Sequence, residues 1–80
     1  MQRSQQISLN SVRIFALVAE TQSVKHAAQR LGVTAGAVSR QIRNLEQTMG
    51  VSLFVRSNNA VSLTPTGETF FRHIQTALHS

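Results

Sequence analysis

The sequence predicts one mainly α-helical domain with three helices, a small two-stranded β-hairpin and a fourth helix. Three observations predict this fold class. Apolar residues recur every three or four positions in three segments between residues 10 and 49. After Gly50 the period shortens, and two short alternating segments flank Asn58 and Asn59. A Thr-Pro pair then opens a last helical pattern.

Length, composition and charge limit the classes of function. Eighty residues suffice for one small domain with a modest core. The chain has no Cys, which excludes disulfides and thiolate metal sites. A net charge of +5 favours a nucleic-acid partner over an acidic protein or a membrane surface. No apolar run could span a bilayer and the amino terminus lacks a secretory signal pattern, so we expect a cytoplasmic protein.

The first helix is expected from residue 10, after a polar leader at residues 1–8. Val12, Phe15 and Ala19 follow helical spacing. Asn10 or Ser11 is expected to cap the first amides.

Ser23 is the predicted N-cap of a second short helix, residues 24–31. Gly32 follows, where a left-handed residue is wanted to end it. The residues expected to be buried are Ala27, Ala28 and Leu31.

Thr34 is the predicted cap of a third helix that runs to about Met49 and stops at Gly50. Only Gly32 and Val33 precede this cap, so the second and third helices must turn sharply against each other. The apolar side of the third helix consists of Val38, Ile42, Leu45 and Met49.

The hairpin is expected at residues 53–57 and 60–64. Thr64 then caps a fourth helix with Pro65 in its first position. Two helices joined by a tight turn and followed by a hairpin form a winged helix-turn-helix. The apolar stripe of the fourth helix consists of Phe70, Ile74, Ala77 and Leu78.

Four segments carry a family resemblance: LNSVRIFALVAE, SVKHAAQRLGVT, AVSRQIRNLEQTMGVSLFVR and VSLTPTGETFF. They resemble, in register and without a gap from residue 9 to about 78, the amino-terminal DNA-binding domain of the LysR-type transcriptional regulators. The resemblance implies a bacterial regulator whose second and third helices form the helix-turn-helix. It implies a DNA-binding domain at residues 9–64 and the start of a linker helix at residues 65–80.

The resemblance also implies partners. The linker helix pairs antiparallel with its copy, so we expect a homodimer on an inverted-repeat operator in double-stranded DNA. A larger ligand-sensing domain normally follows, and a small-molecule effector and higher oligomers are expected only through it. Such a regulator is expected at the nucleoid.

The third helix offers residues that could read bases in the major groove. Ser39, Arg40 and Arg43 lie opposite its apolar side. Arg can bond guanine through two hydrogen bonds, and Ser can bond a base or a phosphate. Arg43 is open to a phosphate or to a pair with Glu46 or Gln47 on its own helix.

The start of the third helix is expected to contribute little to base recognition. Relatives often carry Gln at the position of Ala35 and Pro or Ser at that of Gly36. Ala35 can still meet a thymine methyl, and Gly36 allows the backbone close to a phosphate. DNA shape is expected to supply further specificity.

Phosphate contacts are expected where the second and third helices begin. Ser23 and Lys25 lie where the first helix of such a motif crosses the DNA backbone. Thr34 can cap its helix and also offer its hydroxyl to a phosphate.

The hairpin is the wing. Arg56 matches an Arg in the family and is open to a phosphate or to an internal pair with Glu46. Asn58 and Asn59 form its tip, where relatives often carry basic residues. We therefore expect the wing to touch the minor groove lightly or not at all.

Phe70, Ile74 and Leu78 of the fourth helix can serve as core or as the dimer seam that the resemblance implies. We expect the seam, because an exposed apolar stripe on so small a domain would otherwise lack a cover.

Two other classes of function were weighed. An enzyme or a metal site is not expected, because Asp is absent, the three Glu are scattered and the three His form no ligand set. No cofactor is expected either. A winged helix that binds proteins instead of DNA stays open as the alternative.

Overall fold

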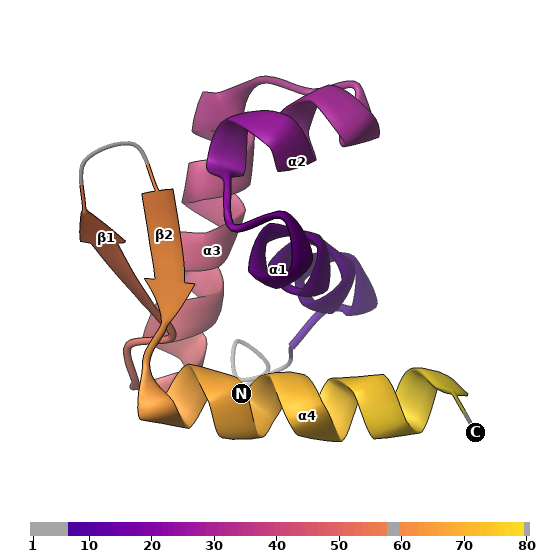
Figure 1. The fold of residues 1–80 in the computed structure, drawn as a ribbon, viewed down its shortest axis with the longest axis vertical. Helices are drawn as coiled ribbons and strands as arrows, with labels where there is room; N and C mark the ends of the chain where they lie inside the picture. Colours follow the sequence, from indigo (N-terminus) through magenta and orange to yellow (C-terminus); the bar gives the residue numbers. More distant parts are fainter. Residues whose placement is uncertain (1–6, 58–59, 80) are drawn as a thin grey trace, which may run out of the picture.

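A computed structural model describes residues 7–57 and 60–79, with side chains through residue 77. The predicted order of elements and the winged helix-turn-helix fold are confirmed. α1 lies in the middle, with α2 above it, α3 and the hairpin to one side and α4 across the bottom (Figure 1). The elements are α1 (Leu9–Thr21), α2 (Val24–Leu31), α3 (Ala35–Met49), β1 (Phe54–Ser57), β2 (Ala60–Leu63) and α4 (Pro65–His79).

α1 begins one residue earlier than predicted. Ser8 has extended backbone, and its Oγ accepts a hydrogen bond from the Ser11 N–H at 3.0 Å. The expected cap at Asn10 or Ser11 is therefore wrong, because Ser8 already satisfies the first turn and Ser11 is buried inside it. At the other end Gln22 adopts a left-handed conformation with φ of 57°. Its carbonyl accepts the Val61 N–H at 3.4 Å, which ties α1 to β2.

Phe15 of α1 is the centre of the core. It has no exposed area, and its ring centroid lies 5.2 Å from that of Phe54 in β1. On α4, Phe70 and Phe71 lie 5.1 Å and 6.2 Å from the same ring. These four rings are the only aromatic side chains in the sequence, apart from His. α1 therefore holds both the hairpin and α4 in position.

The hairpin is antiparallel, with Phe54 opposite Leu63 and Arg56 opposite Val61. Each strand is one residue shorter at the open end than the expected 53–57 and 60–64. Residues 58 and 59 lie outside the described residues. Val61 is buried and Ser62 exposed, as the alternation predicts.

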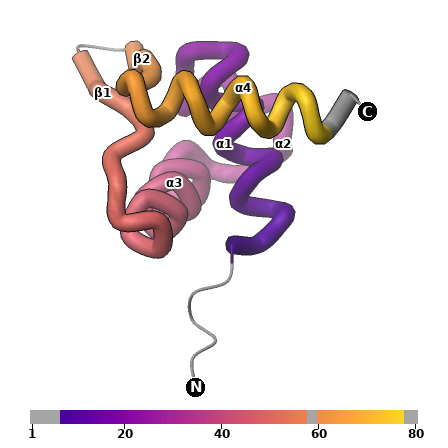
Figure 2. Tube along the Cα trace, turned by 90° about the horizontal axis from the view of Figure 1, so that it is seen from below, coloured from indigo at the N-terminus to yellow at the C-terminus, as the bar shows by residue number. Residues whose placement is uncertain are grey.

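α4 begins as predicted. The Gly67 N–H donates to Thr64 Oγ1 at 2.9 Å, and Pro65 is the first helical residue. The expectation of an exposed stripe is wrong for Ile74, which is only 8% exposed. Phe70 is also partly buried, because α4 runs from the hairpin across α1 (Figure 2). The side chain of Leu78 lies outside the described ones.

The expected burial of Leu31 is also wrong. Ala27 and Ala28 are buried, but Leu31 is 40% exposed. Leu31 is the last residue of α2, past the alanines that join the core. None of the helices in the described residues has the length and apolar character needed to span a lipid bilayer.

Candidate nucleic-acid interface

Hydroxyl caps start α2 and α3, and a glycine ends α2 at the turn between them. Ser23 Oγ accepts the His26 N–H at 3.0 Å, and Thr34 Oγ1 accepts the Ala37 N–H at 3.1 Å. Gly32 ends α2 with φ of 72°. Only residues 32–34 lie between the helices, so the predicted sharp turn is confirmed.

The caps leave hydrogen-bond donors at the starts of both helices. Ser23 and Thr34 each use the hydroxyl oxygen as an acceptor, so each hydroxyl hydrogen can donate outward. Thr34 is exposed, Ser23 is half-buried, and Lys25 is exposed in the first turn of α2. These groups, with the positive end of each helix dipole, could hold an anion such as a phosphate.

α3 presents one side to the core and the other to solvent. Val38, Ile42 and Leu45 are buried, as predicted. The opposite side carries the candidate base-reading residues, of which Ser39 is half-buried and the others are exposed: Ala35, Gly36, Arg40 and Arg43.

The amino end of α3 is smooth. Residues 35–37 carry nothing larger than a methyl group. A Cβ added at Gly36 would have only Thr34 Oγ1 near it, at 4.0 Å. The backbone of this turn is therefore open to close approach by a ligand.

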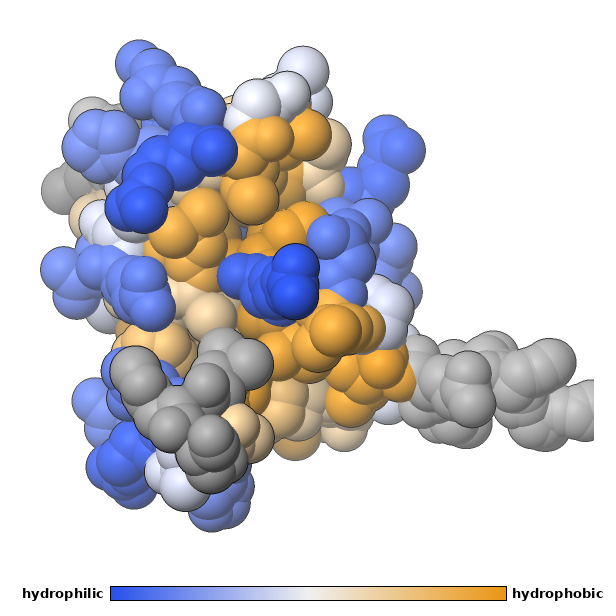
Figure 3. Space-filling view, turned by 90° about the vertical axis from the view of Figure 1, so that its right-hand side faces the viewer, coloured by the Kyte–Doolittle hydropathy of each residue, from blue (hydrophilic) through white to orange (hydrophobic). Residues whose placement is uncertain are grey.

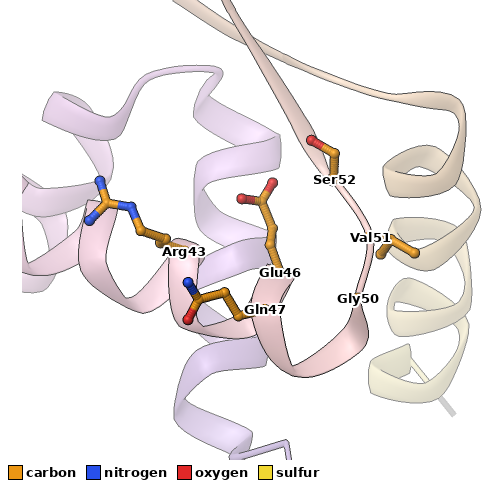
Figure 4. Close-up of a pocket in the computed structure, with 6 residues that line it drawn as sticks. All are labelled: Arg43, Glu46, Gln47, Gly50, Val51 and Ser52. Carbon is orange, nitrogen blue, oxygen red and sulfur yellow. The ribbon is translucent and has the colours of Figure 1, made fainter.

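Glu46 has a role that the sequence did not predict. Its Oε2 accepts the backbone N–H of Leu53 at 2.7 Å and of Phe54 at 3.2 Å. The alternative in which Arg56 pairs with Glu46 is wrong, because this carboxylate binds the start of β1. Arg43 points away from Glu46 (Figure 4), and no pair between these two is found in the described part of the chain. No local sequence signal predicts these bonds, because the two N–H groups belong to the chain after the turn at Gly50.

Arg56 instead contacts α3. Its Nη2 donates to Ser39 Oγ at 3.3 Å. β1 starts near the carboxyl end of α3 and runs toward the level of its amino half (Figure 1). This bond therefore joins the hairpin to the exposed side of α3. The tip residues Asn58 and Asn59 lie outside the described residues.

An open pocket of about 390 Å³ lies at the carboxyl end of α3 (Figure 4). It provides hydrogen-bonding groups but no nucleophile paired with a base. The described residues also contain no group of three His, Cys, Asp or Glu that could hold a metal ion. The pocket is lined by Arg43, Glu46, Gln47, Gly50, Val51 and Ser52.

Comparison with known sequences gives a family match. A family model described as "Bacterial regulatory helix-turn-helix protein, lysR family" matches residues 9–68. The regulator TrpI of Pseudomonas aeruginosa is 48% identical over 60 residues, which cover 75% of this chain and 20% of TrpI. The glycine cleavage system transcriptional activator of Escherichia coli is 42% identical over 67 residues, covering 84% of this chain and 22% of the activator. The chain thus spans about a fifth of the length of these relatives.

A solved structure shares the fold. It is the DNA-binding domain of BenM in complex with benA site 1 DNA, which is 36% identical in sequence. The match covers 90% of this chain and 81% of that chain, with a TM-score of 0.84.

Proposed function

Because the chain belongs to the lysR family of bacterial regulatory helix-turn-helix proteins, we propose that it binds double-stranded DNA sequence-specifically and regulates transcription. α3 enters the major groove, which is wide enough for a helix. The observation that carries this proposal is the solvent-facing side of α3, where Arg40 and Arg43 are exposed. The likeness to a domain solved on DNA supports it.

The candidate residues have separate roles in this proposal, with Ser39 bonding a base or a phosphate and Arg56 a phosphate. Arg40 bonds a guanine, and Arg43 lies one turn further along the groove. Ser23, Lys25 and Thr34 bind phosphates at the two helix starts. Ala35 and Gly36 bring the α3 backbone close to the duplex. The hairpin tip, Asn58 and Asn59, touches the minor groove lightly or not at all.

We further propose that two copies of the domain associate and place two α3 helices on an inverted repeat. The face toward which α4 points is broadly hydrophobic (Figure 3). Ile7 and Leu9, at the start of α1, are 42% and 62% exposed. Since Phe70 and Ile74 are used inside the domain, we place the contact on α4 and the start of α1 together. We assign effector binding, and assembly beyond a dimer, to a further domain of the regulator. We place the regulator at the nucleoid.

Salt-dependent duplex binding tests the proposed function. The tightest binder selected from a random duplex pool is titrated at several salt concentrations. We expect log Kd to rise steeply with log salt, since each phosphate contact releases about one counterion. Binding to no duplex, or binding without a salt slope, would contradict the proposal and favour a protein-binding winged helix.

Substitution of Arg40 tests the role of α3. Arg40→Ala is expected to weaken binding about five- to 150-fold, from the loss of about 1–3 kcal/mol. The melting temperature should stay the same because Arg40 is exposed. Arg72→Ala is the control, since α4 lies at the opposite end of the domain from the start of α3 (Figure 1). Unchanged binding by Arg40→Ala with a large loss of stability would show that Arg40 is structural.

A further inference from the structure

The hydrogen bond between Arg56 and Ser39 joins two residues that the sequence treats as separate DNA contacts. Arg56 lies in β1 and Ser39 in α3, and the Nη2–Oγ distance is 3.3 Å. Arg56 is exposed and Ser39 is half-buried. The bond therefore lies at the surface where α3 and the hairpin meet.

This bond fixes the role of Ser39 Oγ toward Arg56 as hydrogen-bond donor or acceptor. A guanidinium has five N–H donors and no acceptor, so Ser39 Oγ must be the acceptor. The hydroxyl hydrogen then has to point elsewhere. With one lone pair of Oγ occupied by the guanidinium, the hydroxyl hydrogen is directed away from Arg56 and is available to donate to a second group.

A second contact anchors the strand that carries Arg56. Glu46 lies about two helical turns after Ser39, on the same side of α3. Its carboxylate binds the N–H groups of Leu53 and Phe54, at the start of β1. The strand is thus fastened to α3 near Glu46 and runs back along the helix. The Arg56 side chain reaches Ser39 from an anchored backbone.

We propose that Arg56 is a positioning residue that fixes the Ser39 hydroxyl as a hydrogen-bond donor to an acceptor on the DNA. The acceptor is a phosphate oxygen or the acceptor edge of a base. The inference rests on the proposed function and specifies how the wing assists α3: β1 shapes readout through Ser39 and needs no base contact of its own.

A double-mutant cycle on the selected duplex tests the coupling. The variants are Ser39→Ala, Arg56→Lys and the double variant. Lys keeps the positive charge, but its side chain is shorter and lacks the guanidinium fork. We expect Ser39→Ala to weaken binding about five- to tenfold, the effect of one hydrogen bond. Arg56→Lys should weaken it about threefold with an unchanged salt slope, because the charge remains.

The double variant decides the result. We expect it to bind within about twofold of Ser39→Ala, because the two residues act through one hydroxyl. If the two losses instead multiply, the inference is wrong, although the proposed function stands. Arg72→Lys is the matched control: the loss caused by Ser39→Ala should be the same in this background as in the native chain, because Arg72 lies on α4 and not in the hairpin.

The binding-site profile identifies the acceptor. If Ser39→Ala relaxes the preference at one base position, and Arg56→Lys relaxes the same position, the acceptor is a base edge. If both variants weaken binding to all sequences equally, it is a phosphate. Relaxation at different positions would contradict the coupling.

The free domain gives an independent measurement. Side-chain nitrogen NMR of Arg56 should show a guanidinium that is more ordered in the native chain than in Ser39→Ala. Equal mobility in both would overturn the inference even if DNA binds. An ordered Arg56 with no duplex binding would reject the proposed function, and with it the role of Ser39 toward DNA.

Discussion

The α-carbon of Gly67, in the first turn of α4, lies against the backbone carbonyl oxygen of Leu53. A Cβ at position 67 would overlap this oxygen and come within 3.0 Å of Leu63 Cδ2. The same carbonyl accepts the Thr64 N–H at 3.0 Å, and Thr64 in turn caps α4 through Gly67. The bare glycine is what allows α4 to start at the base of the hairpin.

Gly67→Ala is therefore expected to destabilise the domain. The Leu53 carbonyl cannot move away without losing its bond to Thr64. Overpacking of this kind costs about 2 kcal/mol, which lowers the melting temperature by about 10 °C in a domain of this size. Thermal unfolding followed by circular dichroism measures the change. A melting temperature equal to that of the native chain would show that α4 can shift freely on the hairpin.

Glu46→Ala is expected to loosen the wing. The substitution removes the acceptor for two backbone N–H groups, and Leu53 has no exposed area. Leaving such donors unsatisfied costs about 1–3 kcal/mol. Amide hydrogen exchange at residues 53 and 54 should accelerate beyond the change in global stability.

Two further variants distinguish the hydrogen bonds that Glu46 accepts from the effect of its negative charge. Glu46→Gln keeps one carbonyl oxygen and should retain most of the protection. Glu20→Ala, on the exposed side of α1, removes a carboxylate elsewhere and should leave exchange at residues 53 and 54 unchanged. Equal acceleration in Glu20→Ala would mean that net charge, and not the Glu46 bonds, holds β1.

Local rules explain what the sequence could predict. Ser23, Thr34 and Thr64 each bond an amide three residues later. Gly32 and Gly50 end their helices with φ of 72°. Both features depend only on neighbouring residues, so they can be predicted without knowledge of the rest of the fold.

Long-range contacts explain what it could not. Glu46 binds the start of β1 and Arg56 binds Ser39, and each contact exists only once the hairpin lies beside α3. The sequence predicts Ile74 in an exposed dimer seam, but Ile74 is buried because α4 lies across α1. Helical spacing identifies an apolar side of a helix but not the partner that covers it.

Ser11 and Gln41 are expected to be coupled in stability. Ser11 is 9% exposed, and its Oγ donates to Gln41 Oε1 at 2.9 Å, joining α1 to α3. Ser11→Ala leaves the Gln41 oxygen without this donor and should cost about 1 kcal/mol in urea unfolding. In a Gln41→Leu background the same substitution should cost much less. Equal costs in both backgrounds would show that the bond contributes nothing to the free energy of unfolding.

Gly36→Ala is the same chemical change as Gly67→Ala and is expected to have the opposite effect on stability. A Cβ at position 36 enters open space, with its nearest contact at 4.0 Å. Alanine is the better helix former, so the free energy of unfolding should rise by about 0.5 kcal/mol.

DNA binding by Gly36→Ala should change the other way. If the α3 backbone approaches the duplex at Gly36, the added methyl separates the two surfaces and weakens binding by about threefold or more, equal to about 0.7 kcal/mol. Ala37→Gly, one residue later in the same turn, is the matched control for helix propensity and should lower stability. A Gly36→Ala variant that is more stable and binds the selected duplex as tightly as the native chain would place the contact elsewhere on α3, with Arg40 and Ser39 as the residues nearest to the bases.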